Sequence, residues 1–144
     1  MSIKEIREAI VAFGHTNIEA VHPSTLMFTK EKHVSNTGDC IVGVAADKAV
    51  ADLSQKFKKT LRNANAELAI IIDAGGLTSQ INAYGSPKLI LTHLRDTVVR
   101  KSDYVSDRTL AIQADKSSND LPRELVEKLK NPKQKINITL ILHG

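Results

Sequence analysis

The residues of this sequence that could carry out acid–base or metal chemistry are histidines and aspartates spread along the chain. His15, His22 and His93 are versatile, because imidazole changes charge near neutral pH and can bind zinc or iron. Asp39 and Asp107 could act beside them as general acids or bases. Catalysis by these five candidates requires a fold that gathers them. We predict no metal site, because the three histidines that would be its ligands lack the spacing of zinc motifs. His22 and His93 could instead cap turns by hydrogen bonding.

Five cations are candidates for binding an anion. Lys48 and Lys116 each follow an aspartate between an expected strand and an expected helix, where free backbone N–H groups attract phosphate or carboxylate. Lys30, Lys101 and Arg100 add positive charge near expected strand ends. The alternative interpretation is structural: the aspartates cap the helices and the lysines are solvated.

The composition excludes several classes of protein. The 144 residues suit one domain, 1–144, and the formal charge of +4 permits contact with nucleic acid or another polyanion without requiring it. The single cysteine, Cys40, excludes an internal disulfide framework and fits the cytoplasm. The chain has no apolar stretch of membrane-spanning length, and its start does not resemble a signal peptide, so we expect no membrane partner. Two tyrosines, three phenylalanines and no tryptophan leave few rings for stacking bases.

The chain also contains an internal repeat. The stretch AADKAVADL at 45–53 returns as QADKSSNDL at 113–121, and further residues match at the same offset. Upstream of 36–38 the offset is larger by three, which indicates three extra residues there in the first copy. We therefore predict two copies of one unit, residues 6–76 and 77–144.

Periodicity predicts the elements of each unit. After each Ala-Asp-Lys, apolar residues recur every three or four positions, which is the pattern of an amphipathic helix. A segment with apolar residues at alternate positions follows the second helix, and a more uniformly apolar segment follows the first; we expect a strand in both places. Gly75-Gly76 separates the two units and predicts a hairpin turn. The expected strands are 5–13, 24–29, 40–45, 67–73, 77–84, 96–101, 108–113 and 136–142.

We predict an α+β fold, mainly β, in which each unit runs β-β-β-α-β. If 67–73 pairs with 77–84, a pseudo-two-fold axis places 136–142 beside 5–13. The internally duplicated chain would then form a closed or nearly closed β-barrel with two flanking helices, which removes open strand edges.

A resemblance to a known family is carried by two long stretches, GHTNIEAVHPSTLMFTKEKHVSNTGDCIVGVAADKAVADL and YGSPKLILTHLRDTVVRKSDYVSDRTLAIQADK. They resemble an archaeal family catalogued as domain of unknown function 371, and the match extends over nearly the whole chain. This resemblance implies an archaeal source and no particular activity or cofactor. Gly38-Asp39 is also similar to the Gly-Asp turn of cradle-loop barrels, whose duplicated halves form pseudo-two-fold barrels. The second copy has Ser106-Asp107 instead, so only the aspartate recurs.

Three functions remain open from the sequence. The first is a binding module in which the five cations hold an anionic partner, either nucleic acid or a phosphorylated small molecule. The second is an enzyme whose histidines and aspartates meet in the cradle of the barrel, with or without a metal. The third is a protein-interaction scaffold, for which a homo-oligomer is an option. The sequence indicates no cofactor.

Overall fold

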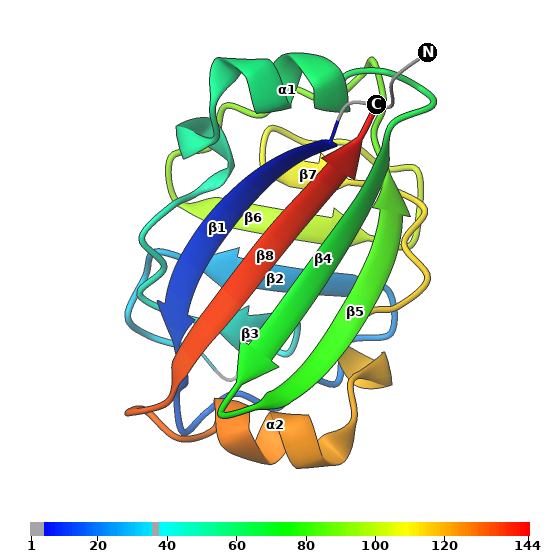
Figure 1. Cartoon of the computed structure of the whole chain (residues 1–144). Coiled ribbons are helices and arrows are strands. Elements are labelled where there is room, and N and C mark those ends of the chain that lie inside the picture. Colours follow the sequence, from blue (N-terminus) through cyan, green and yellow to red (C-terminus); the bar gives the residue numbers. More distant parts are fainter. Residues whose placement is uncertain (1–4, 36–37) are drawn as a thin grey trace.

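The computed structural model describes residues 5–35 and 38–144, so residues 36 and 37 of the expected insertion lie outside the described residues. Two β-sheets lie one behind the other, and one α-helix covers each end of the pair (Figure 1). The elements in chain order are β1 (Glu5–Phe13), β2 (Thr25–Thr29), β3 (Ile41–Gly43), the 3₁₀ helix η1 (Val50–Asp52), α1 (Gln55–Leu61), β4 (Glu67–Ala74), β5 (Leu77–Tyr84), β6 (Asp96–Arg100), β7 (Thr109–Ala111), the 3₁₀ helix η2 (Ser118–Asp120), α2 (Arg123–Leu129) and β8 (Lys135–His143).

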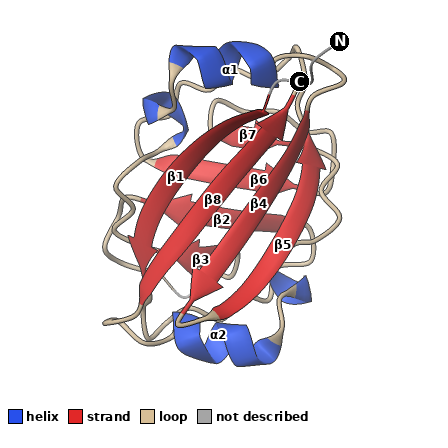
Figure 2. Cartoon of the chain, viewed as in Figure 1, coloured by secondary structure: helices blue, strands red, loops and turns tan. Residues whose placement is uncertain are grey.

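Each half of the chain contributes two strands to each sheet. The first sheet has the order β1-β8-β4-β5, and all of its neighbouring strands are antiparallel. The second sheet has the order β3-β2-β6-β7, with an antiparallel central pair and parallel edge strands. The strands of the two sheets cross rather than run alongside each other (Figure 2). The α+β class therefore holds, as a fold of two packed sheets with helices at the ends.

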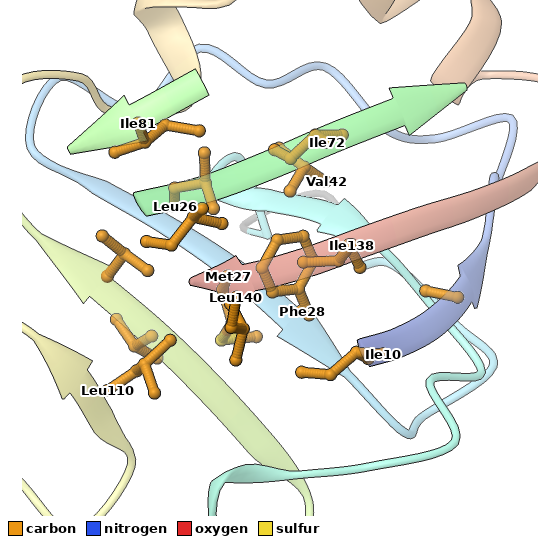
Figure 3. Close-up of a cluster of buried hydrophobic side chains, with 14 of the residues drawn as sticks. Ile10, Leu26, Met27, Phe28, Val42, Ile72, Ile81, Leu110, Ile138 and Leu140 are labelled. Carbon is orange, nitrogen blue, oxygen red and sulfur yellow. The ribbon is translucent and has the colours of Figure 1, made fainter. Parts of the chain in front are cut away.

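The alternation of apolar residues explains how the sheets face each other. Every second residue of β4 and β8 is buried, beginning at Leu68 and Ile136. These side chains meet Leu26, Phe28 and Leu110 of the second sheet in the hydrophobic core, part of which is drawn in Figure 3. Each fully buried side chain of this size stabilises the fold by roughly 1.5–3 kcal/mol, so the two faces bind each other strongly.

The strand pairings predicted for the first sheet are confirmed. β4 and β5 form the expected hairpin, and Gly75 and Gly76 adopt positive φ angles of 61° and 90°. Glycine accepts these angles without steric cost, as a tight two-residue turn requires. β1 pairs with β8 along its whole length, so that Glu5 lies opposite His143.

The predicted barrel is wrong. Among the described residues, the β-bridges between the two sheets are isolated ones, Phe13 with Val44 and Tyr84 with Ile112. The reason is the length and direction of β3 and β7. Each has three residues and pairs in parallel with its neighbour across a break in register, so neither forms a ladder with the first sheet. The similarity to cradle-loop barrels does not extend to a closed sheet.

The two halves share an element order and the same backbone irregularities. Each half runs through three strands, a 3₁₀ helix, an α-helix and a final strand. Within the described ranges, the non-glycine residues with positive φ form two repeat-related pairs, Ala20 with Leu91 and Ala45 with Gln113. Because such angles are uncommon outside glycine, their recurrence at equivalent positions agrees with the expected duplication.

Both α-helices are short, with seven residues each. The cap of α1 is Ser54, whose Oγ accepts the N–H group of Phe57 at 3.1 Å. Asp52 and Asp120 instead accept backbone N–H groups three residues earlier, across the 3₁₀ helices. Across the described ranges, every helix is too short or too polar to cross a bilayer.

Gly85 follows β5 where the backbone passes close to α1. A Cβ atom at this position would lie 2.0 Å from the carbonyl oxygen of Leu61 and 3.0 Å from the Cβ atom of Ala66. We expect Gly85→Ala to lower the free energy of unfolding by about 2 kcal/mol or more, because the backbone must move apart. Urea denaturation measures this change. The exposed substitution Thr78→Ala in β5 serves as the control and should cost less than about 0.5 kcal/mol. Wild-type stability of Gly85→Ala would contradict the close contact.

Candidate anion-binding site

His22 and His93 cap equivalent turns in front of β2 and β6. The Nδ1 atom of His22 accepts the backbone N–H groups of Ser24 and Thr25 at 3.1 and 3.0 Å. The Nδ1 atom of His93 accepts the N–H groups of the corresponding two residues before and at the start of β6, at 3.2 and 2.8 Å. The turn-capping interpretation of these two histidines is therefore confirmed.

The three histidines do not converge. β2 and β6 are antiparallel, so the turns capped by His22 and His93 lie at opposite ends of this strand pair. His15 lies beside the end of α2, where its N–H group donates to the carbonyl oxygen of Leu129 at 3.0 Å. Within residues 5–35 and 38–144, no group of three or more histidine, cysteine, aspartate or glutamate side chains is placed to hold a metal ion.

Asp39 and Asp107 approach the histidines through their main-chain carbonyl groups. The carbonyl oxygen of Asp107 accepts the N–H group of His93 at 3.1 Å. The carbonyl oxygen of Asp39 accepts the Ser118 hydroxyl at 3.3 Å, and this hydroxyl lies 3.4 Å from the carbonyl oxygen of His22. In the part of the chain that the structure describes, no carboxylate of these aspartates bonds to an imidazole, so the geometry does not assemble the expected acid–base pair.

Four of the five predicted anion-binding cations have partners within the fold. The contacts are Lys30 with Asp52 (2.6 Å), Lys101 with Asp120 (2.7 Å), Lys48 with Glu8 (3.2 Å) and Lys116 with the carbonyl oxygen of Gln80 (2.8 Å). A lysine that already contacts a carboxylate or carbonyl offers less positive charge to a ligand. These contacts favour structural roles for the four lysines.

The repeated Asp-Lys motif connects each half to the first sheet. Asp47 accepts the N–H group of Val11 through Oδ1 at 2.9 Å, and its own N–H group donates to the carbonyl oxygen of Val11 at 2.9 Å. Asp115 forms the same two bonds with Asn82, both at 2.9 Å. The aspartate thus extends the edge of β1 or β5 rather than capping a helix, which explains why the motif occurs twice.

Arg100, the fifth predicted cation, lies in a different environment. Its partly buried guanidinium donates from Nε to Thr109 Oγ1 at 2.9 Å and from Nη2 to Ser106 Oγ at 3.2 Å. The ring of Tyr104 packs against it, with 4.9 Å between the guanidinium carbon and the ring centre. Among the described residues, no carboxylate forms an ion pair with Arg100. A partly buried charge without a counter-ion is costly, and a bound anion would relieve that cost.

Arg95 and Arg108 contact the buried Asp96 at the start of β6. The carboxylate of Asp96, whose side chain is 3% exposed, lies 3.1 Å from Arg108 Nη1 and 3.4 Å from Arg95 Nε. The hydroxyl of Thr29 donates to the same carboxylate at 2.8 Å. Arg108 Nη1 also lies 3.8 Å from the sulfur of Met27, so the guanidinium extends over β2. These contacts hold Arg108 in one position on the outer face of the second sheet.

The cluster lowers the pKa values of both Asp96 and Arg100. Burial raises the pKa of Asp96, but hydrogen bonds from a threonine and two arginines outweigh burial and leave this pKa below its usual range. Burial lowers the pKa of Arg100, and the nearby positive charge of Arg108 lowers it further. An anion bound near both positive charges would oppose this effect.

A cavity of about 260 Å³ opens beside Arg108 on this outer face. Its apolar lining comes from Met27 and Ile41, and its charged lining includes Glu31 and Arg95. It therefore adjoins the Arg100–Arg108 cluster and offers room for the remainder of a ligand held there.

Two other cavities are less suited to binding an anion. One of about 160 Å³ is lined by Glu19 and Asp39 together with Lys130. Another of about 260 Å³ lies at the β4–β5 side of the first sheet, near Tyr84 and His143. Neither is lined by an arginine, so the cluster on the second sheet is the better candidate site.

Sequence reasoning selected Arg100 but missed Arg108 and the role of Asp96. A signal was present in the difference between the two halves. Arg108 occupies the position that Cys40 has in the first half, and Asp96 occupies the position of Thr25. Residues needed for the shared frame recur in both halves, so a charged residue present in one half alone is a candidate for a function of its own.

Sequence comparison connects this architecture to other proteins. A family model described as "Domain of unknown function (DUF371)" matches residues 10–143. The chain belongs to this family. It is also similar to the uncharacterized protein MJ0206 of Methanocaldococcus jannaschii, with 46% identity over 127 residues that cover 88% of this chain and 93% of the relative. The resemblance seen in the sequence is confirmed, and neither description assigns an activity.

Loss of the His93 cap should destabilise the turn that positions Asp96. His93→Ala leaves two backbone N–H groups without their acceptor, and we expect the free energy of unfolding to fall by about 1–3 kcal/mol in urea denaturation. His93→Asn serves as the matched variant, because a side-chain carbonyl can replace Nδ1 as the acceptor, and it should recover part of the loss. Equal stability of His93→Ala and the wild type would rule out a capping role.

Asp120 links stability to pH through its bond to Lys101. That bond, together with the N–H group of Ser117, lowers the pKa of Asp120 to about 2. A carboxylate whose pKa is lower in the folded state stabilises the fold above its unfolded pKa, about 3.9, and this contribution is lost as the pH falls through about 2. Because the pair is more than a third exposed, Asp120→Asn should cost less than about 1 kcal/mol at pH 7.

The difference between wild type and Asp120→Asn should shrink when urea denaturation is repeated near pH 2. Asp103→Asn is the control, because Asp103 accepts a bond from Gln113 and has no cationic partner among the described residues. A difference in free energy of unfolding that stays constant across this pH range would show that the charge of Asp120 does not stabilise the fold.

Proposed function

We propose that this protein binds a small phosphorylated molecule, with the phosphate held between Arg100 and Arg108 on the outer face of the second sheet. One observation carries the proposal. The guanidinium of Arg100 is partly buried, lies within the electrostatic influence of Arg108 and has no carboxylate partner among the described residues. An anion at this place would offset the repulsion between the two cations.

The chemistry of the cluster suits phosphate. Guanidinium groups donate planar, paired hydrogen bonds that match the oxygens of phosphate or carboxylate. Thr109 and Ser106 accept bonds from two nitrogens of Arg100, which orients the group without neutralising it. Asp96 orients Arg108 through an ion pair with the Nη1 atom of this arginine. Each arginine therefore keeps donors that the described contacts leave to a ligand.

The nearby cysteine supports binding rather than nucleophilic catalysis. Burial raises the pKa of the Cys40 thiol and outweighs a hydrogen bond with Thr25 that lowers it, and the charge of Asp39 adds to the increase. A thiol stays protonated at neutral pH under these conditions and is a weak nucleophile. The free thiol also fits the cytoplasmic location expected from the sequence, which remains part of this proposal.

A small molecule fits the distribution of charge better than a nucleic acid does. Nucleic-acid binding draws on several unpaired cations along one surface, because each neutralises a phosphate of the backbone. Four of the predicted cations contact carboxylates or a carbonyl instead. Of the five predicted cations, Arg100 alone has neither a carboxylate nor a carbonyl partner among the described residues, which suits one phosphate better than a polymer.

Isothermal titration with glycerol phosphate tests the proposal on the intact chain. We expect the wild type to bind and Arg100→Gln to bind at least 10-fold more weakly, since a charge-assisted hydrogen bond contributes about 1.5–3 kcal/mol. Arg7→Gln is the matched control. Arg7 lies on the outer face of the first sheet, pairs with Glu5 at 2.9 Å and should not affect binding.

Two results would count against the proposal. One is a wild type that does not bind glycerol phosphate, and the other is equal weakening by Arg7→Gln and Arg100→Gln. Fluorescence anisotropy with labelled RNA and DNA at two salt concentrations provides the competing test. Tight, salt-sensitive binding of a polymer that survives Arg100→Gln would favour nucleic acid as the partner.

A further inference from the structure

The cavity beside Arg108 constrains what the rest of the ligand can be. Arg108 lines this cavity and also belongs to the proposed phosphate site, so a phosphate held there lies at the edge of the cavity. The volume of about 260 Å³ is below the roughly 300–1,000 Å³ of pockets for drug-sized ligands. This volume suits a small molecule that extends by a few non-hydrogen atoms beyond the phosphate.

Asp96 is not available to this occupant. One oxygen of its carboxylate accepts the Thr29 hydroxyl at 2.8 Å and Arg95 Nε at 3.4 Å. The other accepts Arg108 Nη1 at 3.1 Å and Arg95 Nη2 at 3.5 Å. With both oxygens occupied, Asp96 orients the arginines and leaves recognition of the ligand to other groups.

Glu31 and His33 are the acceptors that remain. Glu31 pairs with Arg95 Nη1 at 3.6 Å, which is longer than a hydrogen bond, and its side chain is 52% exposed. The imidazole of His33 is exposed and has no hydrogen-bond partner among the described residues. Both side chains line the cavity and can accept a hydrogen bond from a ligand.

The lining of the cavity therefore combines two cations, Arg95 and Arg108, with the two acceptors Glu31 and His33. Met27 and Ile41 provide an apolar lining that carbon atoms of a ligand can contact. The negative charge of Glu31 opposes a second phosphate beside it and favours a hydroxyl group that donates to it. In the second half, Ser102 and Tyr104 occupy the positions of Glu31 and His33, so this arrangement belongs to one half.

We infer that the ligand is a small polyol monophosphate whose hydroxyl groups lie in the cavity against Glu31 and His33. This inference rests on the proposed function and adds a substrate class to it. The phosphate provides affinity through the arginines, and the hydroxyl groups provide selectivity through Glu31 and His33. A monophosphate of similar size without hydroxyl groups would lose the second set of contacts.

A panel of four probes tests this selectivity by isothermal titration: inorganic phosphate, propyl phosphate, glycerol phosphate and glycerol bisphosphate. Propyl phosphate is the matched probe, since it has the same carbon chain as glycerol phosphate without the hydroxyl groups. We expect the wild type to bind glycerol phosphate at least 5-fold more tightly than each of the other three.

Glu31→Ala should reduce the preference for glycerol phosphate over propyl phosphate to less than 2-fold and leave the affinity for propyl phosphate unchanged. Glu127→Ala is the control, because Glu127 lies on α2 with a side chain that is 75% exposed. Since both glutamates are exposed, the variants should fold, and amide nuclear magnetic resonance spectra verify this.

The outcomes separate the inference from the proposed function. Equal binding of inorganic phosphate, propyl phosphate and glycerol phosphate, all weakened by Arg100→Gln, would overturn the polyol inference and leave the phosphate site in place. Tighter binding of glycerol bisphosphate would also overturn the inference, because it requires a second cationic subsite. If none of the four probes binds, the proposed function fails together with the inference.

Discussion

The structure depends on hydrogen bonding between repeat-related strands at the centre of both sheets. β4 pairs with β8 in the first sheet and β2 pairs with β6 in the second, so each central pair joins one strand from each half. A half on its own would leave the edges of both central strands unpaired. The two halves therefore form one core, and the apolar faces of the central strands enclose it between the layers.

The same pairing decides where the candidate site lies. Asp96 and Arg100 lie on one face at the two ends of β6, because side chains alternate along a strand and these two are an even number of positions apart. The parallel pairing of β7 places the carbonyl group of Arg108 beside the N–H group of Val98, midway between them. The pairing of β6 with β7 thus brings Arg108 onto the same surface as Asp96 and Arg100 through backbone geometry.

Recurring and unique residues have different roles in this fold. Lys30 and Lys101 make equivalent ion pairs, and His22 and His93 make equivalent turn caps. Arg108, by contrast, has no charged counterpart in the other half. The symmetric frame provides stability from contacts made twice, and the charges that occur in one half alone belong to the proposed anion site.

The sequence by itself determined the order of strands and helices, the Gly75-Gly76 hairpin and the pairing of β1 with β8, because periodicity and turn residues act locally and the repeat relates one half to the other. Only the tertiary structure decided that the sheets stay separate, since closure depends on how far β3 and β7 extend beside strands distant in sequence. The tertiary structure also decided which cations have a carboxylate partner and which do not. The charge of Lys48 is visible in the sequence, but its neutralisation depends on Glu8, forty residues earlier, and only folding brings the two within 3.2 Å. Arg100 became the candidate for the same reason, because no carboxylate in the described chain folds against it.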